Sequence, residues 1–351
     1  MDDVRTSREK GLPLHIKRFH TGTLNTSAWK SLVARYQVPS TRRGIWQLGN
    51  SVFPFLVMWY LMYRSLEVSY WLTLLLAIPT AGLLIRIFII QHDCGHASFM
   101  RWKRVNDLIG SICGILTFTP YQHWRKQHAI HHANNSDLER RGVGDIWTMT
   151  VEEYQRETRW GRFKYRLYRH PLVLFVIGPS LMLMIFHRLP PRDSFKLRDR
   201  ERASILWTNL ALGAGTVALT WALGIGDFMR VQIPILVVAA SVGTWLFYVQ
   251  HQFEDVYWSK DRAWDYYTAA IRGSSYYKLP QILQWFTGNI GFHHVHHLSH
   301  RIPNYLLQKC HEENPAFHQA TVLTLWSSLR TMELALWDEK KRKLVRFRDA
   351  A

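Results

Sequence analysis

The sequence predicts an all-α integral membrane protein in which two hairpins supply four transmembrane helices and a cytosolic helical cap holds a di-metal site. Three observations support this fold class. Hydrophobic residues make up 48% of the 351 residues and gather in long runs. Lysine and arginine, which give the chain a net charge of +18, lie mainly between those runs. Histidines are concentrated in three short windows, each at the end of an apolar run or just beyond it.

Four apolar runs approach or reach the length of about 20 residues that a membrane-spanning helix needs. Residues 45–63 and 69–90 form a first hairpin around a very short connection, and residues 203–223 and 231–250 form a second hairpin. Each hairpin returns the chain to the side from which it started. Arg86 lies near the end of the second run, where its long side chain is expected to snorkel towards the interface.

Two further apolar runs are predicted to be interfacial helices that do not cross the membrane. Residues 108–118 are too few to span a bilayer, and residues 171–186 are interrupted by Gly178 and Pro179. If the second of these runs crossed fully, the second and third histidine windows would lie on opposite faces. They could then not share one metal site.

The distribution of cations predicts which side of the membrane holds the histidines. Residues 1–44 form a basic segment with nine lysines and arginines against three acidic residues. By the positive-inside rule this segment is cytosolic. The membrane domain is expected at 45–310 and a helical tail at 311–351. The histidine windows and the tail are then cytosolic as well. The basic, amphipathic segment Trp160–Arg169 is expected to lie against anionic headgroups.

The same distribution argues against a nucleic-acid-binding protein, although the net charge alone is compatible with one. The cations alternate with long apolar runs and do not build one basic domain. Cys94, Cys113 and Cys310 form no CxxC pair, which fits a reducing cytosolic face.

The histidine windows have the spacing of metal ligands. Residues i and i+4 of a helix lie on one face, so both can point at one centre. In the pattern H-x2-H-H, residues i and i+3 share a face and the adjacent histidine points about 100° away, so one turn can serve two neighbouring metals. Eight histidines exceed the needs of a mononuclear site, and two metals are predicted. The windows are His92-x3-His96, His128-x2-His131-His132 and His293-x2-His296-His297.

These three boxes resemble those of the membrane-bound fatty acid desaturases, over roughly residues 45 to 310. The flanking segments Gly288–Phe292 and Leu298–Tyr305 are most similar to those of bacterial and plastid acyl-lipid desaturases. Box one has three intervening residues where acyl-CoA Δ9 desaturases usually have four. Box three begins with His293, where front-end desaturases usually have glutamine. The resemblance implies an oxygen-dependent enzyme that introduces a cis double bond into a lipid-esterified acyl chain.

The resemblance also implies a di-iron centre, with O2 as co-substrate and the eight boxed histidines as ligands. His251, at the end of the fourth predicted span, is a ninth ligand on a looser resemblance, whereas His294 lies off the box pattern. Imidazole ligands are also compatible with copper, so the choice of iron rests on the family. Trp147 is a hypothetical lining residue of a substrate tunnel. Carboxylates that can orient the imidazoles are Asp93, Asp145, Glu254 and Asp255.

Electrons must come from a separate protein, because the sequence holds no iron–sulfur cysteine set, dinucleotide fingerprint or fused cytochrome b5 signature. Ferredoxin, flavodoxin and cytochrome b5 are the expected donors. The cytosolic cations either steer such an acidic donor or only set topology and touch lipid, and both can hold. Two rival functions are a di-iron hydroxylase or ketolase acting on a lipid or carotenoid, and a metal transporter. Transport is disfavoured because the boxes flank the spans.

Overall fold

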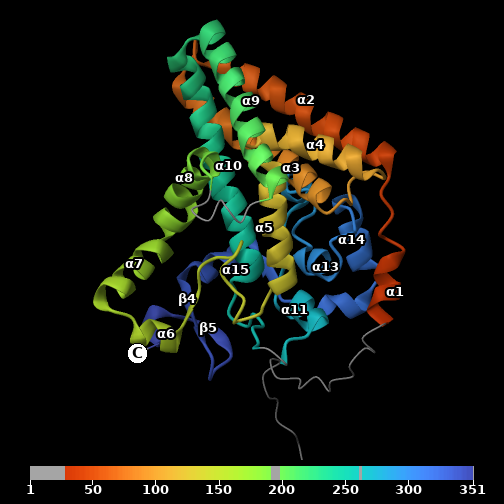
Figure 1. Ribbon diagram of the computed structural model, residues 1–351, viewed down its shortest axis with the longest axis vertical. Helices are drawn as coiled ribbons and strands as arrows, with labels where there is room; N and C mark the ends of the chain where they lie inside the picture. Colours follow the sequence, from red (N-terminus) through yellow and green to blue (C-terminus); the bar gives the residue numbers. More distant parts are fainter. Residues whose placement is uncertain (1–27, 191–197, 261–262, 351) are drawn as a thin grey trace, which may run out of the picture.

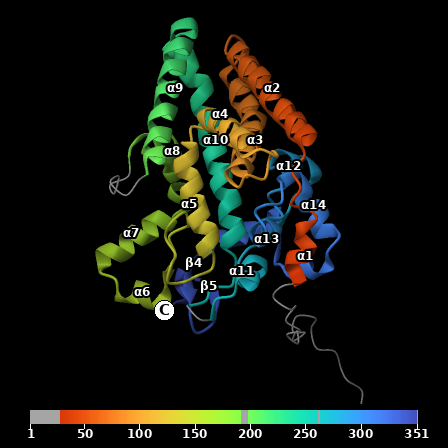
Figure 2. The same ribbon diagram turned by 45° about the vertical axis from the view of Figure 1, so that its right-hand side comes forward.

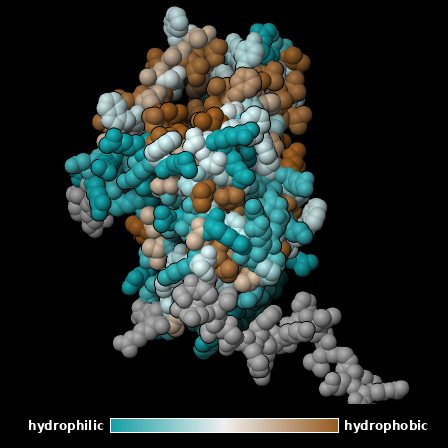
Figure 3. All heavy atoms as spheres, turned by 90° about the vertical axis from the view of Figure 1, so that its right-hand side faces the viewer, coloured by the Kyte–Doolittle hydropathy of each residue, from teal (hydrophilic) through white to brown (hydrophobic). Residues whose placement is uncertain are grey.

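The computed structural model describes residues 28–190, 198–260 and 263–350. Most of the predicted basic segment at 1–44 therefore lies outside the described residues. The molecule has two ends (Figure 1): long helices form one of them, and short helices and strands form the other. Apolar side chains gather over the end with the long helices, and hydrophilic side chains gather over the opposite end (Figure 3).

The long helices correspond to the four predicted spans and form two hairpins. They are α2 (Thr41–Ser65), α3 (Tyr70–Gly95), α9 (Asp199–Leu223) and α10 (Ile225–His251). Among the described helices, α3, α9 and α10 are long and apolar enough to cross a membrane. Helix α2 is equally long, but Gln47, Asn50 and Ser51 reduce the apolarity of its first half. The four-span arrangement therefore stays a prediction.

The two runs predicted to be interfacial form helices of different kinds. Helix α4 (Lys103–Leu116) rises about 1.5 Å per residue and is therefore too short to cross a bilayer. Residues 171–186 fall in a segment that bends by 64° against α7 (Arg159–Arg169). Pro179 has no amide hydrogen to donate, and the N–H of Gly178 bonds the carbonyl of Val173, so the chain makes a π-helical turn there. The segment consists of η1 (Val173–Ile177), α8 (Gly178–Met184) and η2 (Phe186–Arg188).

The cap beneath the long helices is mostly helical, and it carries two of the histidine boxes. Helix α5 contains box two and helix α13 contains box three. The helices of the cap are α1 (Ala28–Ala34), α5 (Tyr121–Asn134), α6 (Val151–Arg156), α11 (Tyr266–Arg272), α12 (Gln281–Phe286), α13 (His293–Leu298), α14 (Asn304–Glu312), α15 (Leu325–Leu329) and the 3-10 turns η5 (Pro315–Gln319), η6 (Arg330–Glu333) and η7 (Phe347–Asp349).

The prediction of an all-α fold is wrong in the cap, where two small sheets occur. One sheet has the order β1-β4-β5, with β1 parallel to β4 and β4 antiparallel to β5. The other sheet consists of β2 and β3, which are parallel. The strands are β1 (Met149–Thr150), β2 (Tyr276–Lys278), β3 (Val322–Thr324), β4 (Leu334–Asp338) and β5 (Lys343–Arg346).

The prediction of a helical tail at 311–351 is also wrong, because β3, β4 and β5 lie within it. Its last part is a β-hairpin, because two short apolar runs, in β4 and β5, flank a charged turn too tight for a helix. The Asp338 carboxylate accepts the backbone N–H groups of Lys340 and Lys341 in that turn, and Arg342 adopts a φ of 53°.

Arg86 does not snorkel, and that prediction is wrong as well. Its residue surface is only 7% exposed. The guanidinium donates to Ser51 Oγ at 3.1 Å and to the backbone carbonyl of Trp285, and it lies 4.1 Å from the centre of the Trp285 ring. These neutral acceptors hold the side chain between α2, α3 and α12. Arg86 therefore fastens the segment before box three to the helix that carries box one.

Candidate metal centre

Four helices bring the predicted ligands to one place at the boundary between the long helices and the cap. The last turn of α3 carries His92, and His96 is its C-terminal cap. His251 is the last residue of α10. Boxes two and three lie within α5 and α13, which are separate short helices. Each histidine is thus fixed by helical geometry at a helix end or on a short helix.

The nine predicted histidines fall into two groups, each compact enough to hold a metal ion. Within a group, one nitrogen from every histidine lies within 4.8 Å of one nitrogen from each of the others. The first group is His92, His96, His128, His132 and His296, and the second is His131, His251, His293 and His297.

Boxes two and three each contribute to both groups, although not in the expected way. The histidines at i and i+4 share a group, as His128 and His132 do, and the histidine at i+3, His131, joins the other group. The sequence had predicted that i and i+3 would share a face. Four residues turn a helix by 400° and three turn it by 300°, so i+4 is offset by about 40° and i+3 by about 60°. The smaller offset decides the pairing.

The spacing of the imidazole nitrogens fits bound metal ions. An imidazole nitrogen lies about 2.1 Å from a divalent metal such as zinc, so two ligands at right angles are about 3.0 Å apart. The Nε2 atoms of His128 and His132 are 3.0 Å apart, those of His132 and His296 are 3.0 Å apart, and those of His251 and His293 are 2.9 Å apart.

Three other ring nitrogens support the same conclusion. The Nε2 atoms of His92, His96 and His131 are buried and have no hydrogen-bond partner among the described residues. Buried polar atoms are nearly always paired, so these nitrogens, two in the first group and one in the second, suit the role of metal ligands. These residues fit a metal ion at each group.

The electrostatic environment favours neutral imidazoles, the form that binds metals. Burial is the main cause that lowers the pKa of six of these histidines well below the usual range, and neighbouring histidines lower it further. The six are His96, His128, His132, His293, His296 and His297.

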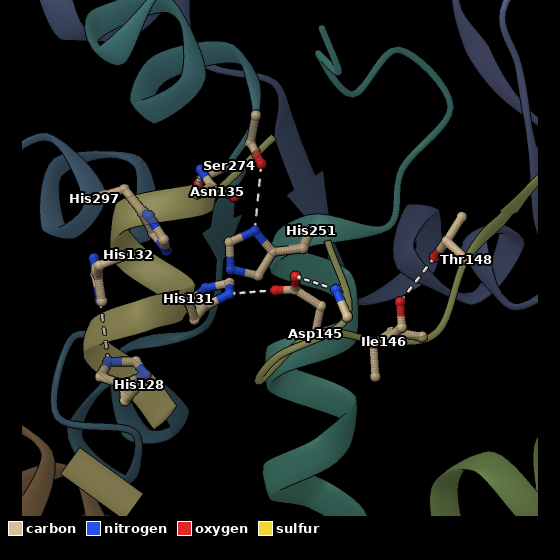
Figure 4. A network of polar contacts seen from close by, with 12 residues as sticks. His128, His131, His132, Asn135, Asp145, Ile146, Thr148, His251, Ser274 and His297 are labelled. Carbon is tan, nitrogen blue, oxygen red and sulfur yellow. Dashed lines mark hydrogen bonds and ion pairs between the residues drawn. The ribbon is translucent and has the colours of Figure 1, made fainter. Parts of the chain in front are cut away.

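Two of the four predicted orienting carboxylates contact a histidine of the groups. Asp145 Oδ1 lies 2.5 Å from Nδ1 of His131, and Asp93 Oδ1 lies 3.1 Å from Nδ1 of His92 (Figure 4 shows the first of these contacts). A carboxylate that accepts the Nδ1 proton fixes the tautomer and leaves Nε2 free for a metal.

The other two carboxylates are placed elsewhere, and the structure corrects this part of the prediction. Glu254 pairs with Lys343 at 2.7 Å, and both Glu254 and Asp255 are exposed. Helix α10 ends at His251 and the chain then turns outwards, so proximity in sequence to His251 does not bring these carboxylates to the histidines.

Several supporting residues were not predicted. The carbonyl of Gly273 lies 3.3 Å from Nδ1 of His251 and gives that ring its orientation. Asn304 donates its backbone and side-chain N–H groups to Asp93 at 2.6 and 2.8 Å, and thereby ties the start of α14 to box one. Asn304 directly follows Pro303 and begins α14, and this pattern in the sequence could have indicated a helix start at this position. The ring of His300 lies 4.9 Å from that of His96.

Trp147 lies away from the two groups. Its side chain is 42% exposed, and its ring packs against Tyr165 and Tyr168 at 4.9 and 5.5 Å between centroids. A small cavity beside the second group is lined in part by His131, Asp145 and His251 but not by Trp147. The role of Trp147 in a substrate tunnel stays a prediction.

The fold and this centre define a class of protein: a membrane-associated helical protein with histidine clusters capable of binding metal ions. Comparison with known proteins gives the family. A model of the fatty acid desaturase family matches residues 69–328. A fatty acid desaturase from Bacillus subtilis is 46% identical over 316 residues, which cover 90% of this chain and 89% of that protein. The chain belongs to the fatty acid desaturase family and is an oxidoreductase of that kind.

More distant relatives have names that specify a substrate or a donor. An sn-1 oleoyl-lipid 12-desaturase from Synechocystis is 28% identical, over 75% of this chain and 72% of the relative. An sn-1 acyl-lipid omega-3 desaturase (ferredoxin) from Synechocystis is 27% identical, over 64% of this chain and 62% of the relative.

Proposed function

We propose that this chain is an oxygen-dependent acyl-lipid desaturase that forms a cis double bond at a di-iron centre. The observation that carries the proposal is the division of nine histidines into groups of five and four whose nitrogens have metal-ligand spacing. A mononuclear site would leave one group unexplained. Iron is chosen because the family chemistry is oxidative, and zinc cannot change its oxidation state.

The roles of the chain's own residues follow from their contacts. A di-iron centre held by these histidines would supply the oxidising chemistry: one hydrogen leaves each of two adjacent methylenes, and these two hydrogens, two electrons from the donor and two protons reduce O2 to two molecules of water. Asp93 and Asp145 hold the Nδ1 protons of His92 and His131, so that both rings present Nε2 to the metals. Burial keeps the remaining imidazoles neutral and excludes bulk water from them.

The substrate and donor are inferred from the relatives and from the surface. The two Synechocystis relatives are named for lipid-linked acyl chains, and the long helices of this chain expose apolar residues from which such chains can approach. One of them is named with ferredoxin. A separate ferredoxin, flavodoxin or cytochrome b5 is therefore the proposed electron source.

We place the chain in the membrane as a multi-pass protein with four spans, namely α2 in addition to α3, α9 and α10. Both termini and the histidine centre then face the cytosol, because the cations of the described residues lie mostly on the cap. The bent segment α7–α8 lies at the same interface in this arrangement.

The test is the fatty acid profile of a desaturase-free bacterial host that expresses the chain. Wild type is expected to produce a new unsaturated acyl species, His131→Ala is expected to produce none, and Glu254→Gln is expected to match wild type because Glu254 touches no histidine of the groups. Hydroxylated or oxo products would move the assignment to a hydroxylase or ketolase. An unchanged profile from iron-loaded protein with added ferredoxin would refute an acyl-lipid substrate and direct attention to carotenoids or sphingoid lipids.

A further inference from the structure

Two short helices in the second half of the chain carry an exposed apolar surface that the histidine centre does not use. Helix α12 follows strand β2, and helix α15 begins at the residue directly after strand β3. Because β2 and β3 are paired in parallel, the two helices leave the same edge of one sheet. The surface is formed by Ile282, Leu283, Trp285, Val322, Leu325, Trp326 and Leu329, of which Trp326 is 82% and Ile282 67% exposed.

Helix α12 packs against the spanning part of α3. A Cβ added to Gly82 would lie only 2.8 Å from the ring of Phe286, so the two helices are in close contact. Arg86 donates to the carbonyl of Trp285. Gly82 and Arg86 lie ten and six residues before His92, which places these contacts about 15 and 9 Å along α3 from the histidine. Figure 2 shows α12 beside α3.

Helix α15 is tied to the corresponding part of α10. Trp245 Nε1 donates to the hydroxyl of Tyr277 at 3.3 Å, and that hydroxyl lies 3.1 Å from Ser328 Oγ in α15. Trp245 precedes His251 by six residues, or about 9 Å of helix. Both short helices therefore reach the apolar part of a candidate span, beyond the level of the histidines.

The charges around this surface match those of a lipid layer. Residues 281–286 and 322–329 contain no acidic residue. Lys278, at the end of β2, and Arg330, directly after α15, are exposed at the margin of the apolar surface. A large exposed apolar patch bordered by cations is typical of a surface that meets acyl chains and anionic headgroups.

We propose that Gln281–Phe286 and Val322–Arg330 form a platform, here called the C-terminal platform, that inserts into the leaflet on the histidine side of the membrane. The bilayer is favoured as its occupant because the patch is continuous with the apolar parts of α3 and α10. The inference rests on the proposed membrane placement of those two helices. It assigns to the membrane a part of the chain that the sequence had placed in the cytosolic tail.

The test uses the full chain in vesicles of phosphatidylcholine and phosphatidylglycerol. Single cysteines replace Trp326 on the platform, Ile78 on the lipid-facing side of α3, and Lys340 in the exposed turn between β4 and β5, and each is labelled with an environment-sensitive fluorophore. The native cysteines are buried, and labelled wild type gives their background. Lipids carrying a nitroxide on the acyl chain are then introduced.

Trp326→Cys is expected to lose as much fluorescence as Ile78→Cys, whereas Lys340→Cys keeps its signal and is quenched by aqueous iodide. If Trp326→Cys behaves like Lys340→Cys while Ile78→Cys is quenched by lipid, the platform inference is overturned, and the surface contacts a protein partner or a second copy. If Ile78→Cys also escapes quenching, the membrane placement itself fails, and the platform inference fails with it. All three positions are exposed, so the substitutions leave the packed core unchanged.

Discussion

Removal of the Asp145 carboxylate is expected to loosen one of the two metals and leave the other nearly unchanged. Asp145 accepts from Nδ1 of His131 at 2.5 Å and from the backbone N–H of Gly142 at 3.2 Å, and only the first contact bears on a ligand. A hydrogen bond to a charged group contributes about 1.5–3 kcal/mol, and each 1.4 kcal/mol is about tenfold in an equilibrium constant. Asp145→Ala should therefore weaken retention of the second metal by roughly 10- to 100-fold, in the range known for such outer partners.

Asp145→Asn provides a graded comparison, because the amide oxygen can still accept the Nδ1 proton. Retention of the second metal should weaken by about tenfold in Asp145→Asn, at the lower end of the range given for Asp145→Ala. The assay is the rate at which purified, iron-loaded protein releases iron to a coloured chelator. Since His131 belongs only to the second group, half of the iron should leave faster in the variants and half at the wild-type rate.

The matched control is Glu254→Gln, which removes an exposed carboxylate that pairs with Lys343. Its release curve should match that of wild type. The reasoning would be refuted by an Asp145→Ala protein that releases all of its iron at the wild-type rate. Equal acceleration of both halves would refute the division of the histidines into two groups.

Three further predictions concern ligation and packing. His251→Ala should reduce bound iron from two towards one per chain, measured by metal analysis, because it leaves its group with three histidines. Arg86→Met should lower the free energy of unfolding by about 3 kcal/mol, since the hydrogen bonds of a buried charged group are lost, and the melting temperature in detergent would fall. Gly110→Ala should destabilise the protein by about 1–3 kcal/mol, because its Cβ would overlap the buried ring of Tyr121, whereas Gly213→Ala meets nothing within 4 Å and should be neutral or stabilising.

Each of these predictions has an outcome that would contradict it. Two irons retained by His251→Ala would remove that residue from the proposed ligand set. His294→Asn is its control, because His294 contacts His311 and not the groups. For Arg86, the Lys variant should keep part of the stability, and equal loss in Lys and Met would show that the packing of the side chain, not its charge, is important. Equal melting temperatures for Gly110→Ala and Gly213→Ala would mean that Tyr121 moves freely.

The sequence predicted the parts of the site that depend on local helical spacing. The boxed histidines repeat within single helical turns, so the distance between them along the chain determines their distance in space. Asp93 and Asp145 were also predicted, the former as a neighbour of His92. The assignment of Glu254 as an orienting carboxylate failed because the direction of its side chain depends on how the chain leaves α10. The distance along the sequence from His251 does not specify that direction. The carbonyl of Gly273 could not have been predicted, because it comes from a distant loop.

The fold was predicted best where apolar length alone is decisive. The two hairpins appear with ends close to those expected, since a run of apolar residues has few alternatives to a long helix. The β4–β5 hairpin was missed because its two runs are short, and Arg86 was misplaced because its partner, the carbonyl of Trp285, lies far away along the chain.

The sharing of boxes two and three between both histidine groups has a consequence for how the enzyme is assembled. Helices α5 and α13 each present ligands to both positions, so neither position is complete until both helices are docked. The first ion to arrive therefore orders side chains that the second ion needs, and the entropy of that ordering is lost only once. The second iron should accordingly bind somewhat more easily than the first, while the separate ligand sets still let a chain hold one ion alone. Maturation of the enzyme then depends on the docking of α5 and α13 more than on the filling of either position.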